Sequence, residues 1–257
     1  MADCEAIIAA AARSKAKLML AYRLHFESAT LEALRVVRSG ELGEVHLFSS
    51  VFCQKVGAEN HRARHGFWAG PVADMGPYPI NAARAMFGAE PEEVMAVGSR
   101  TEGSGFDFDD TASVTLRFPG GRLAQFCVSY CGNPIDQYRV VGTHGDLEVN
   151  PGFMFNGALG HVLRVGDEAV ATTFDATDQF GGELKYFSDC IRDDIDPEPD
   201  GQEGLADVRV IAAIEQALAT GRPQQLEPLL RERRPDTSQR MTLPPIEVPE
   251  LVDAAAP

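Results

Sequence analysis

Asp74 and Tyr78 stand four residues apart, on either side of the turn sequence Met75-Gly76-Pro77. A carboxylate and a phenol on one tight turn can share a substrate hydroxyl, and a tyrosine beside a cation can pass a proton. The structural alternative is that Asp74 caps the turn and Tyr78 packs in the core. On the residues alone that alternative is favoured, because caps outnumber catalytic pairs.

A charged stretch precedes this pair and contains His61, Arg62, Arg64 and His65. It is either a loop that contributes cations to a polar pocket or a solvated surface loop. A metal site is disfavoured, since the two histidines have no carboxylate or cysteine partner at a recognisable spacing.

Arg23 and His25 follow the short apolar run 17–22, which reads as a buried parallel strand. Open α/β sheets bind ligands beyond the carboxyl ends of their strands, so both residues are candidate substrate-binding residues. Surface ion pairing is the alternative.

The sequence carries no dinucleotide fingerprint. Gly103-Ser104-Gly105 lacks a third glycine and runs into acidic residues instead of a helix, so we assign no cofactor-binding residue. The acidic run 107–110 is typical of a solvated strand entry, and we assign no metal ligand.

Composition excludes several classes of function. The chain has 257 residues with 23 Lys and Arg against 38 Asp and Glu, a net charge of −15 that disfavours nucleic acid as a partner. Its apolar runs are far shorter than the roughly 20 residues that span a bilayer. Five scattered cysteines and the lack of a signal-peptide pattern at the start predict a cytoplasmic protein with reduced thiols.

Hydrophobic periodicity predicts helices at both ends of the chain and strands between them. We expect helices over 2–14, 28–39, 79–88, 180–191 and 205–218, and strands over 17–22, 44–53, 93–100, 111–118, 124–130, 137–141, 145–150, 153–156 and 161–165. This is an α+β pattern. The strand 17–22 has no other αβ repeat to pair with, which indicates the last unit of a larger domain.

Four stretches together resemble the glucose–fructose oxidoreductase / inositol dehydrogenase / rhizopine-catabolism (Gfo/Idh/MocA) family of NAD(P)-dependent oxidoreductases. They are LMLAYRLHFE (18–27), GPVADMGPYPINAARAMFGAEPEEVMA (70–96), DQYRVVGTHGDLEVNP (136–151) and EPDGQEGLADVRVIAAIEQALATGRP (198–223). The subgroup nearest glucose–fructose oxidoreductase is the best match. The double glycine that usually precedes the family's aspartate is reduced here to Ala69-Gly70.

The resemblance implies a fold and a division of the chain. Residues 1–24 would be a remnant of the Rossmann domain, 25–225 the substrate and oligomerisation domain, and 226–257 an extended tail. The main domain would be a large open, mainly antiparallel sheet with helices on one face, and its other face would form a homo-oligomer. Most of the Rossmann domain, with its glycine fingerprint and motif lysine, would be missing.

The resemblance also implies site residues. The family's Asp-x-x-x-Tyr pair falls on Asp74 and Tyr78, which would hold the sugar and relay a proton, with Arg23 and Arg62 in the pocket. NADP or NAD would be the cofactor, not bound by this chain alone. The implied function is the substrate-binding part of a sugar or polyol oxidoreductase, inactive by itself. The alternative is a standalone, non-catalytic carbohydrate-binding or oligomerisation protein.

Overall fold

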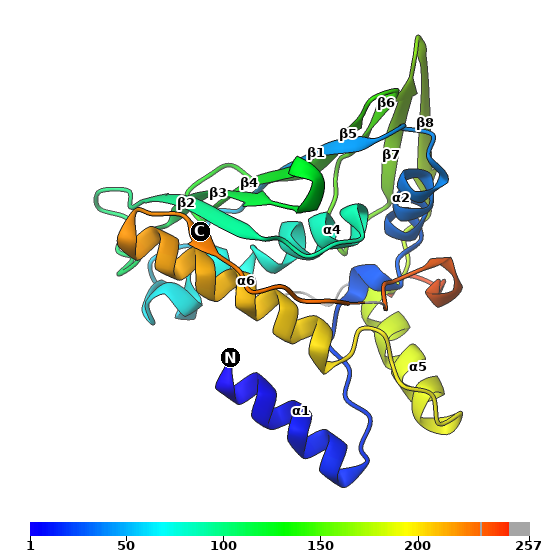
Figure 1. The fold of residues 1–257 in the computed structure, drawn as a ribbon, viewed down its shortest axis with the longest axis horizontal. Coiled ribbons are helices and arrows are strands. Elements are labelled where there is room, and N and C mark those ends of the chain that lie inside the picture. Colours follow the sequence, from blue (N-terminus) through cyan, green and yellow to red (C-terminus); the bar gives the residue numbers. More distant parts are fainter. Residues whose placement is uncertain (232, 247–257) are drawn as a thin grey trace.

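The computed structural model describes residues 1–231 and 233–246, and it shows a mixed α/β fold built on one open sheet (Figure 1). Within these residues the sheet has nine strands in the order β8-β7-β6-β5-β1-β4-β3-β2-β9. The strands are β1 Val45–Cys53, β2 Glu93–Ser99, β3 Thr111–Arg117, β4 Leu123–Ser129, β5 Ile135–Gly142, β6 Gly145–Val149, β7 Leu159–Val165, β8 Glu168–Phe174 and β9 Gln224–Gln225. β1 and β4 run parallel, and the other neighbouring strands run antiparallel.

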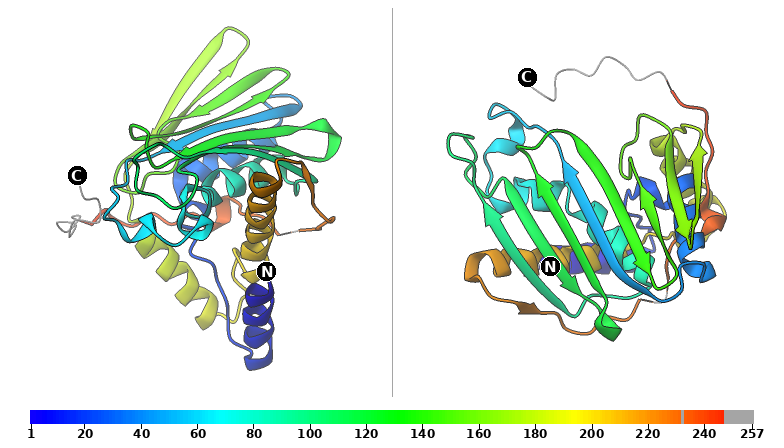
Figure 2. Two further views of the ribbon diagram at one scale, coloured as in Figure 1. Left: turned by 90° about the vertical axis from the view of Figure 1, so that its left-hand side faces the viewer. Right: turned by 90° about the horizontal axis from the view of Figure 1, so that it is seen from above.

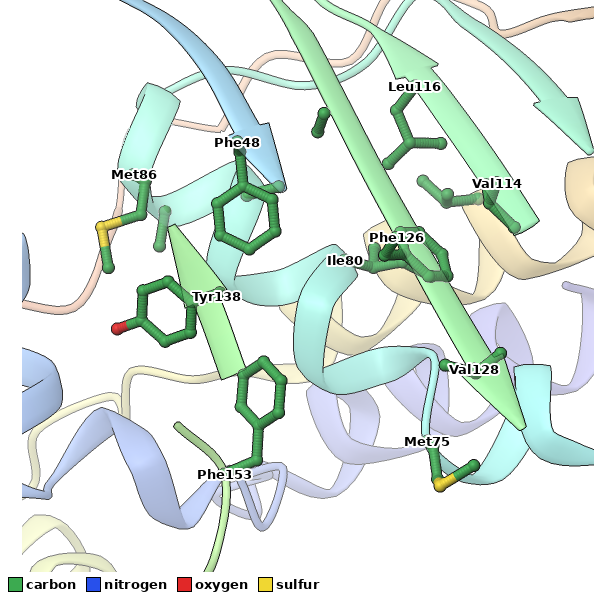
Figure 3. Packing of buried hydrophobic residues seen from close by; sticks show 14 of the residues in the cluster. Phe48, Met75, Ile80, Met86, Val114, Leu116, Phe126, Val128, Tyr138 and Phe153 are labelled. Atoms are coloured by element: carbon green, nitrogen blue, oxygen red, sulfur yellow. The ribbon is translucent and has the colours of Figure 1, made fainter. Parts of the chain in front are cut away.

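Alternating side chains explain why one face of the sheet is buried. In β3 and β4 the even-numbered residues, including Val114 and Phe126, are fully buried, and the odd-numbered ones are more exposed. These side chains meet Ile80, which lies on the helix α4 (Pro77–Phe87) beneath the sheet (Figure 3). The helices gather on this face, and the opposite face of the sheet is left uncovered (Figure 2).

The longer helices begin and end at residues that satisfy their free backbone groups. The helices α2 (Ser28–Ser39), α5 (Gln179–Arg192) and α6 (Gly201–Thr220) are capped by the carboxylates of Glu27, Asp178 and Asp200. α2 ends at Gly40 with φ +83°, a conformation that suits glycine. α4 begins at Pro77, two residues earlier than predicted, and ends as expected at Gly88.

Two predicted strands are wrong. Residues 17–22 form only one isolated bridge, between Met19 and Asp200, because no parallel neighbour is present among the described residues. Residues 153–156 are irregular, and their carbonyl groups bind Arg23 instead of a strand. β8 was not predicted, because it is an exposed edge strand whose sequence has little apolar alternation.

The N-terminal helix α1 (Ala2–Ser14) forms as predicted but buries none of its residues. It contacts α6 and projects with α5 away from the sheet (Figure 1).

Shorter helical segments are η1 (Arg23–His25), η2 (His61–Ala63), η3 (Phe67–Ala69), α3 (Pro71–Asp74), η4 (Pro119–Gly121) and η5 (Thr237–Gln239). No described helix combines the length and the apolar character needed to cross a membrane.

The tail after α6 runs back along the molecule. Leu226 N–H donates to Glu92 O beside β2, and Met241 N–H donates to Phe26 O. Apart from η5, residues 226–231 and 233–246 form neither helix nor strand, whereas 232 and 247–257 lie outside the described residues.

A fully buried arginine joins α4 to α6. The guanidinium of Arg84, with no exposed surface, contacts three carboxylates: Glu90 at 2.6 Å, Glu203 at 2.7 Å and Asp207 at 2.5 Å. Arg234 from the tail also pairs with Glu90 at 2.6 Å. The cluster therefore holds two helices and the tail through charges that only stay buried when paired.

We expect Arg84→Met to lower the free energy of unfolding by about 3–5 kcal/mol, because three buried carboxylates lose their main partner. Urea denaturation followed by circular dichroism measures this. Arg117→Met is the matched control, since Arg117 is half-exposed and pairs with Glu93 on the surface, and it should cost less than about 1 kcal/mol. Equal losses of unfolding free energy in both variants would contradict the stabilising role of the buried Arg84 cluster.

Candidate functional site

Asp74 ends α3 and accepts hydrogen bonds on one oxygen. Its Oδ2 atom lies 3.0 Å from the Tyr130 hydroxyl, 3.2 Å from Arg62 Nε and 3.4 Å from Gln54 Nε2. No described residue donates to Oδ1, and the side chain is about one-third exposed. The helix α4 that follows has no side-chain cap, so the capping alternative for Asp74 is wrong.

Tyr78 lies in the first turn of α4 with its ring half-buried. The ring contacts Phe52 edge-on with centroids 5.4 Å apart and Phe153 at 5.6 Å. Its hydroxyl makes no hydrogen bond to a residue that the structure describes. The packing alternative is thus correct for the ring and leaves the hydroxyl available for a substrate.

Arg23, in η1, is a buried cation beside Tyr78. It donates to the carbonyl oxygens of Phe153 and Met154 and to Gln179 Oε1. The guanidinium carbon lies 5.1 Å from the centroid of the Tyr78 ring. These hydrogen-bond acceptors are all neutral, and Arg23 forms no ion pair within the described chain.

Glu183, on α5, is a buried carboxyl that interacts electrostatically with Arg23. Burial raises its pKa to about 7, and the charges of Arg23 and His25 act in the opposite direction. Its Oε1 atom is buried without a partner among the described residues. Glu183 therefore changes charge near neutral pH, close to the guanidinium that lies over Tyr78.

His25 lies between two acceptors. Its Nδ1 is 3.0 Å from Glu198 Oε2, and its Nε2 is 2.7 Å from Asn81 Oδ1. The Asn81 amide nitrogen donates to Glu203 and Asp207, so the amide oxygen must face His25. Both ring nitrogens therefore donate, which makes His25 an imidazolium.

A cavity of about 220 Å³ lies beside these residues. Arg23, His25, Tyr78 and Asn81 line it, together with apolar side chains such as Met86. Asp74 and Arg62 do not line it, so the predicted residues form two neighbouring groups. One group surrounds the Asp74 carboxylate, and the other surrounds the Tyr78 ring.

The charged loop 60–65 contributes one residue to the site. Arg62 pairs with Asp74, whereas no contact with the site is recorded for His61, Arg64 or His65. Within the described residues no three His, Cys, Asp or Glu side chains gather closely enough to hold a metal ion.

Sequence reasoning missed Gln54, Tyr130 and Asn81. Gln54 directly follows β1 and Tyr130 directly follows β4, two neighbouring parallel strands, so both reach Asp74 from the same end of the sheet. Strand alternation placed Tyr130 on the core side, but the parallel pairing that brings it to Gln54 was not evident from the sequence.

The described residues do not form a dinucleotide cradle. Gly103 and Gly105 have positive φ angles, but their loop leads into β3 and not into a helix. The run 17–22 lacks the parallel neighbours that such a site needs. We therefore assign no dinucleotide-binding residue among the described residues.

The buried imidazolium makes stability depend on pH. Burial lowers the pKa of His25, but Glu198 and Asn81 outweigh it, and the pKa lies above its usual 6.5. A histidine whose pKa is raised by folding stabilises the folded state while it is protonated. This contribution is complete below pH 6.5, the usual pKa, and is lost as the pH rises through the pKa in the folded state. We expect the stability advantage of the wild type over His25→Gln to shrink between pH 6 and pH 9.

Urea denaturation across this pH range tests the prediction. His46→Gln is the control, because His46 is exposed and lies 3.9 Å from the exposed Glu44, and its replacement should change the stability much less than His25→Gln does. An advantage that grows with pH would show that His25 is buried in its neutral form.

Comparison with known proteins identifies the family. Residues 30–148 match the model of the GFO/IDH/MocA C-terminal domain. The chain is 31% identical over 214 residues to D-xylose 1-dehydrogenase (NADP(+)) 2 of Haloferax volcanii, covering 82% of this chain and 65% of the relative. It is 29% identical to D-xylose 1-dehydrogenase [NADP(+)] of Haloarcula marismortui, covering 80% of this chain and 59% of the relative.

A solved structure extends the likeness to the fold. The aldose-aldose oxidoreductase from Caulobacter crescentus, complexed with glycerol, is 34% identical with a TM-score of 0.80, and the match covers 88% of this chain and 68% of that one. The chain thus spans about three-fifths to two-thirds of the length of these relatives. The matched sequence and fold together show that this chain belongs to the GFO/IDH/MocA family of oxidoreductases.

Proposed function

We propose that this chain is the substrate-binding part of an NAD(P)-dependent oxidoreductase that transfers hydride between a nicotinamide and a sugar or polyol. The Asp74 carboxylate carries the proposal, because its donors among the described residues all bind Oδ2 and none of them binds Oδ1. The xylose dehydrogenases and the aldose-aldose oxidoreductase among its relatives support this substrate class.

In this proposal Asp74 accepts a hydrogen bond from a substrate hydroxyl through Oδ1. Tyr78 exchanges a proton with the oxygen of the reacting carbon. When Tyr78 gives up that proton, the positive charge of Arg23 at 5.1 Å from its ring stabilises the negative charge that develops on the phenol. Arg62 neutralises Asp74 from the other side. The nicotinamide, when bound, supplies the hydride.

The proposal places the dinucleotide site outside the residues of this chain. Residues 1–24 then belong to the dinucleotide-binding domain, and residues 25–225 form the substrate domain. The missing glycine-rich turn supports this division. The same observation favours a second candidate, a standalone carbohydrate-binding protein without catalysis, and both candidates require that this chain bind sugar.

We expect D-xylose or D-sorbitol to bind the purified chain, and Asp74→Asn and Tyr78→Phe to weaken binding about tenfold each, the usual effect of losing one good hydrogen bond. Isothermal titration calorimetry measures the affinities. Asp175→Asn is the matched control, because Asp175 is exposed in the connection between β8 and α5. This variant should bind the sugar with the affinity of the wild type.

Two results would contradict the proposal. Unchanged affinity in both site variants would place the sugar elsewhere. Binding of NADPH at micromolar concentration, followed by its fluorescence, would mean that a dinucleotide site lies within this chain.

We also propose that the uncovered sheet face forms a homo-oligomer. Met95 and Val97 of β2 and Leu123 of β4 are exposed on this face, and Val97 retains 75% of its surface. Large apolar side chains exposed on one face of a protein are typical of a protein interface. The helices lie on the other side of the sheet (Figure 2).

Val97→Lys should convert the oligomer to monomers, because a charge buried in the interface must be desolvated. Size-exclusion chromatography with light scattering measures the mass. Leu230→Lys is the control, because Leu230 is 85% exposed in the tail and should leave the mass unchanged. A monomeric wild type would contradict this part of the proposal.

A further inference from the structure

Asp74 is held asymmetrically by three side chains of very different character. Arg62 is one-third exposed and reaches Oδ2 from η2. Gln54 lies at 3.4 Å, close to the limit for a hydrogen bond. Tyr130 is fully buried and lies at 3.0 Å. The buried Tyr130 hydroxyl is therefore the most firmly held of the three donors.

The position of Tyr130 is fixed on every side. Its ring packs against Phe106 at 5.8 Å and Phe108 at 6.2 Å between centroids. Its backbone N–H donates to Asp110 O at 2.9 Å. Asp110 is itself buried and accepts from Thr101. The hydroxyl thus has little freedom to leave Asp74.

The Tyr130 hydroxyl has one proton and two acceptors. It lies 3.0 Å from Asp74 Oδ2 and 3.1 Å from Ala69 O. The charged acceptor makes the stronger hydrogen bond, so the proton is directed mainly at Asp74. Burial, followed by the charge of Asp74, raises the pKa of Tyr130 far above its usual value. Tyr130 therefore stays protonated and acts as a hydrogen-bond donor to Asp74.

We propose that Tyr130 is a positioning residue that locks the Asp74 carboxylate in one rotamer and thereby presents Oδ1 to a substrate hydroxyl. This inference rests on the proposed function for the identity of the substrate, a sugar or polyol. The locking itself depends only on contacts within this chain. Tyr130 touches Asp74 and not the reacting atoms, so its effect is on orientation.

The direct test is the rotamer of Asp74 in the purified chain. Three-bond couplings from the Asp74 Cγ carbon to its backbone nitrogen and carbonyl carbon, measured by NMR with labelled aspartate, should show one χ1 rotamer in the wild type. In Tyr130→Phe the couplings should be averaged over rotamers, and the affinity for D-xylose or D-sorbitol should fall about tenfold.

Tyr138→Phe is the matched control for these couplings. Tyr138 is also buried and on the core side, but its hydroxyl has no hydrogen-bond partner in the part of the chain that the structure describes. Removing it should leave the Asp74 couplings as they are in the wild type. A change in this variant as large as in Tyr130→Phe would reveal a general packing effect and overturn the proposal.

Two further outcomes separate this inference from the proposed function. Averaged couplings in the wild type overturn the locking role without any variant, so the test does not depend on the folding of Tyr130→Phe. If the couplings behave as expected but the wild type binds no sugar or polyol, the locking role is supported and the proposed function fails.

Discussion

The buried Arg84 cluster is the interaction on which the positions of the site residues depend. It ties α4, which carries Tyr78 and Asn81, to α6, which supplies Glu203 and Asp207. Asn81 in turn positions His25, because Asn81 Oδ1 lies 2.7 Å from His25 Nε2. The N-terminal segment is fixed in the same way, since the Tyr22 hydroxyl donates to Asp207 at 2.7 Å. A charge cluster far from solvent thus determines where η1 lies relative to α4.

The two halves of the candidate site are supported by different parts of the fold. Tyr78 and its neighbours depend on helix packing and on the irregular segment around Phe153. Asp74 depends on the ends of β1 and β4, whose parallel pairing places Gln54 and Tyr130 side by side. The short connection between α3 and α4 joins the two halves and sets the separation of the carboxylate and the phenol.

Local sequence patterns predicted most elements, because alternation and helical spacing act over a few residues. The α2 helix, with Gly40 at its end, and the hairpin of β3 and β4 are examples. The patterns failed where long-range partners decide the outcome. Residues 17–22 look like a strand but bridge only at Met19, and β8 has no apolar alternation but pairs fully with β7. Asp74 and Tyr78 were identified as a pair, whereas Tyr130 needed the three-dimensional register.

The central strand β1 lies between β4 and β5, which begin about seventy and about eighty residues after β1 ends. Closing such a large loop costs entropy before any contact repays it, and folds rich in these contacts fold slowly. During synthesis both hydrogen-bonding edges of β1 therefore stay unpaired until β4 and β5 have left the ribosome. The surroundings of Asp74 are complete only after that step, because Gln54 follows β1 and Tyr130 follows β4, so this chain acquires its candidate site late in folding.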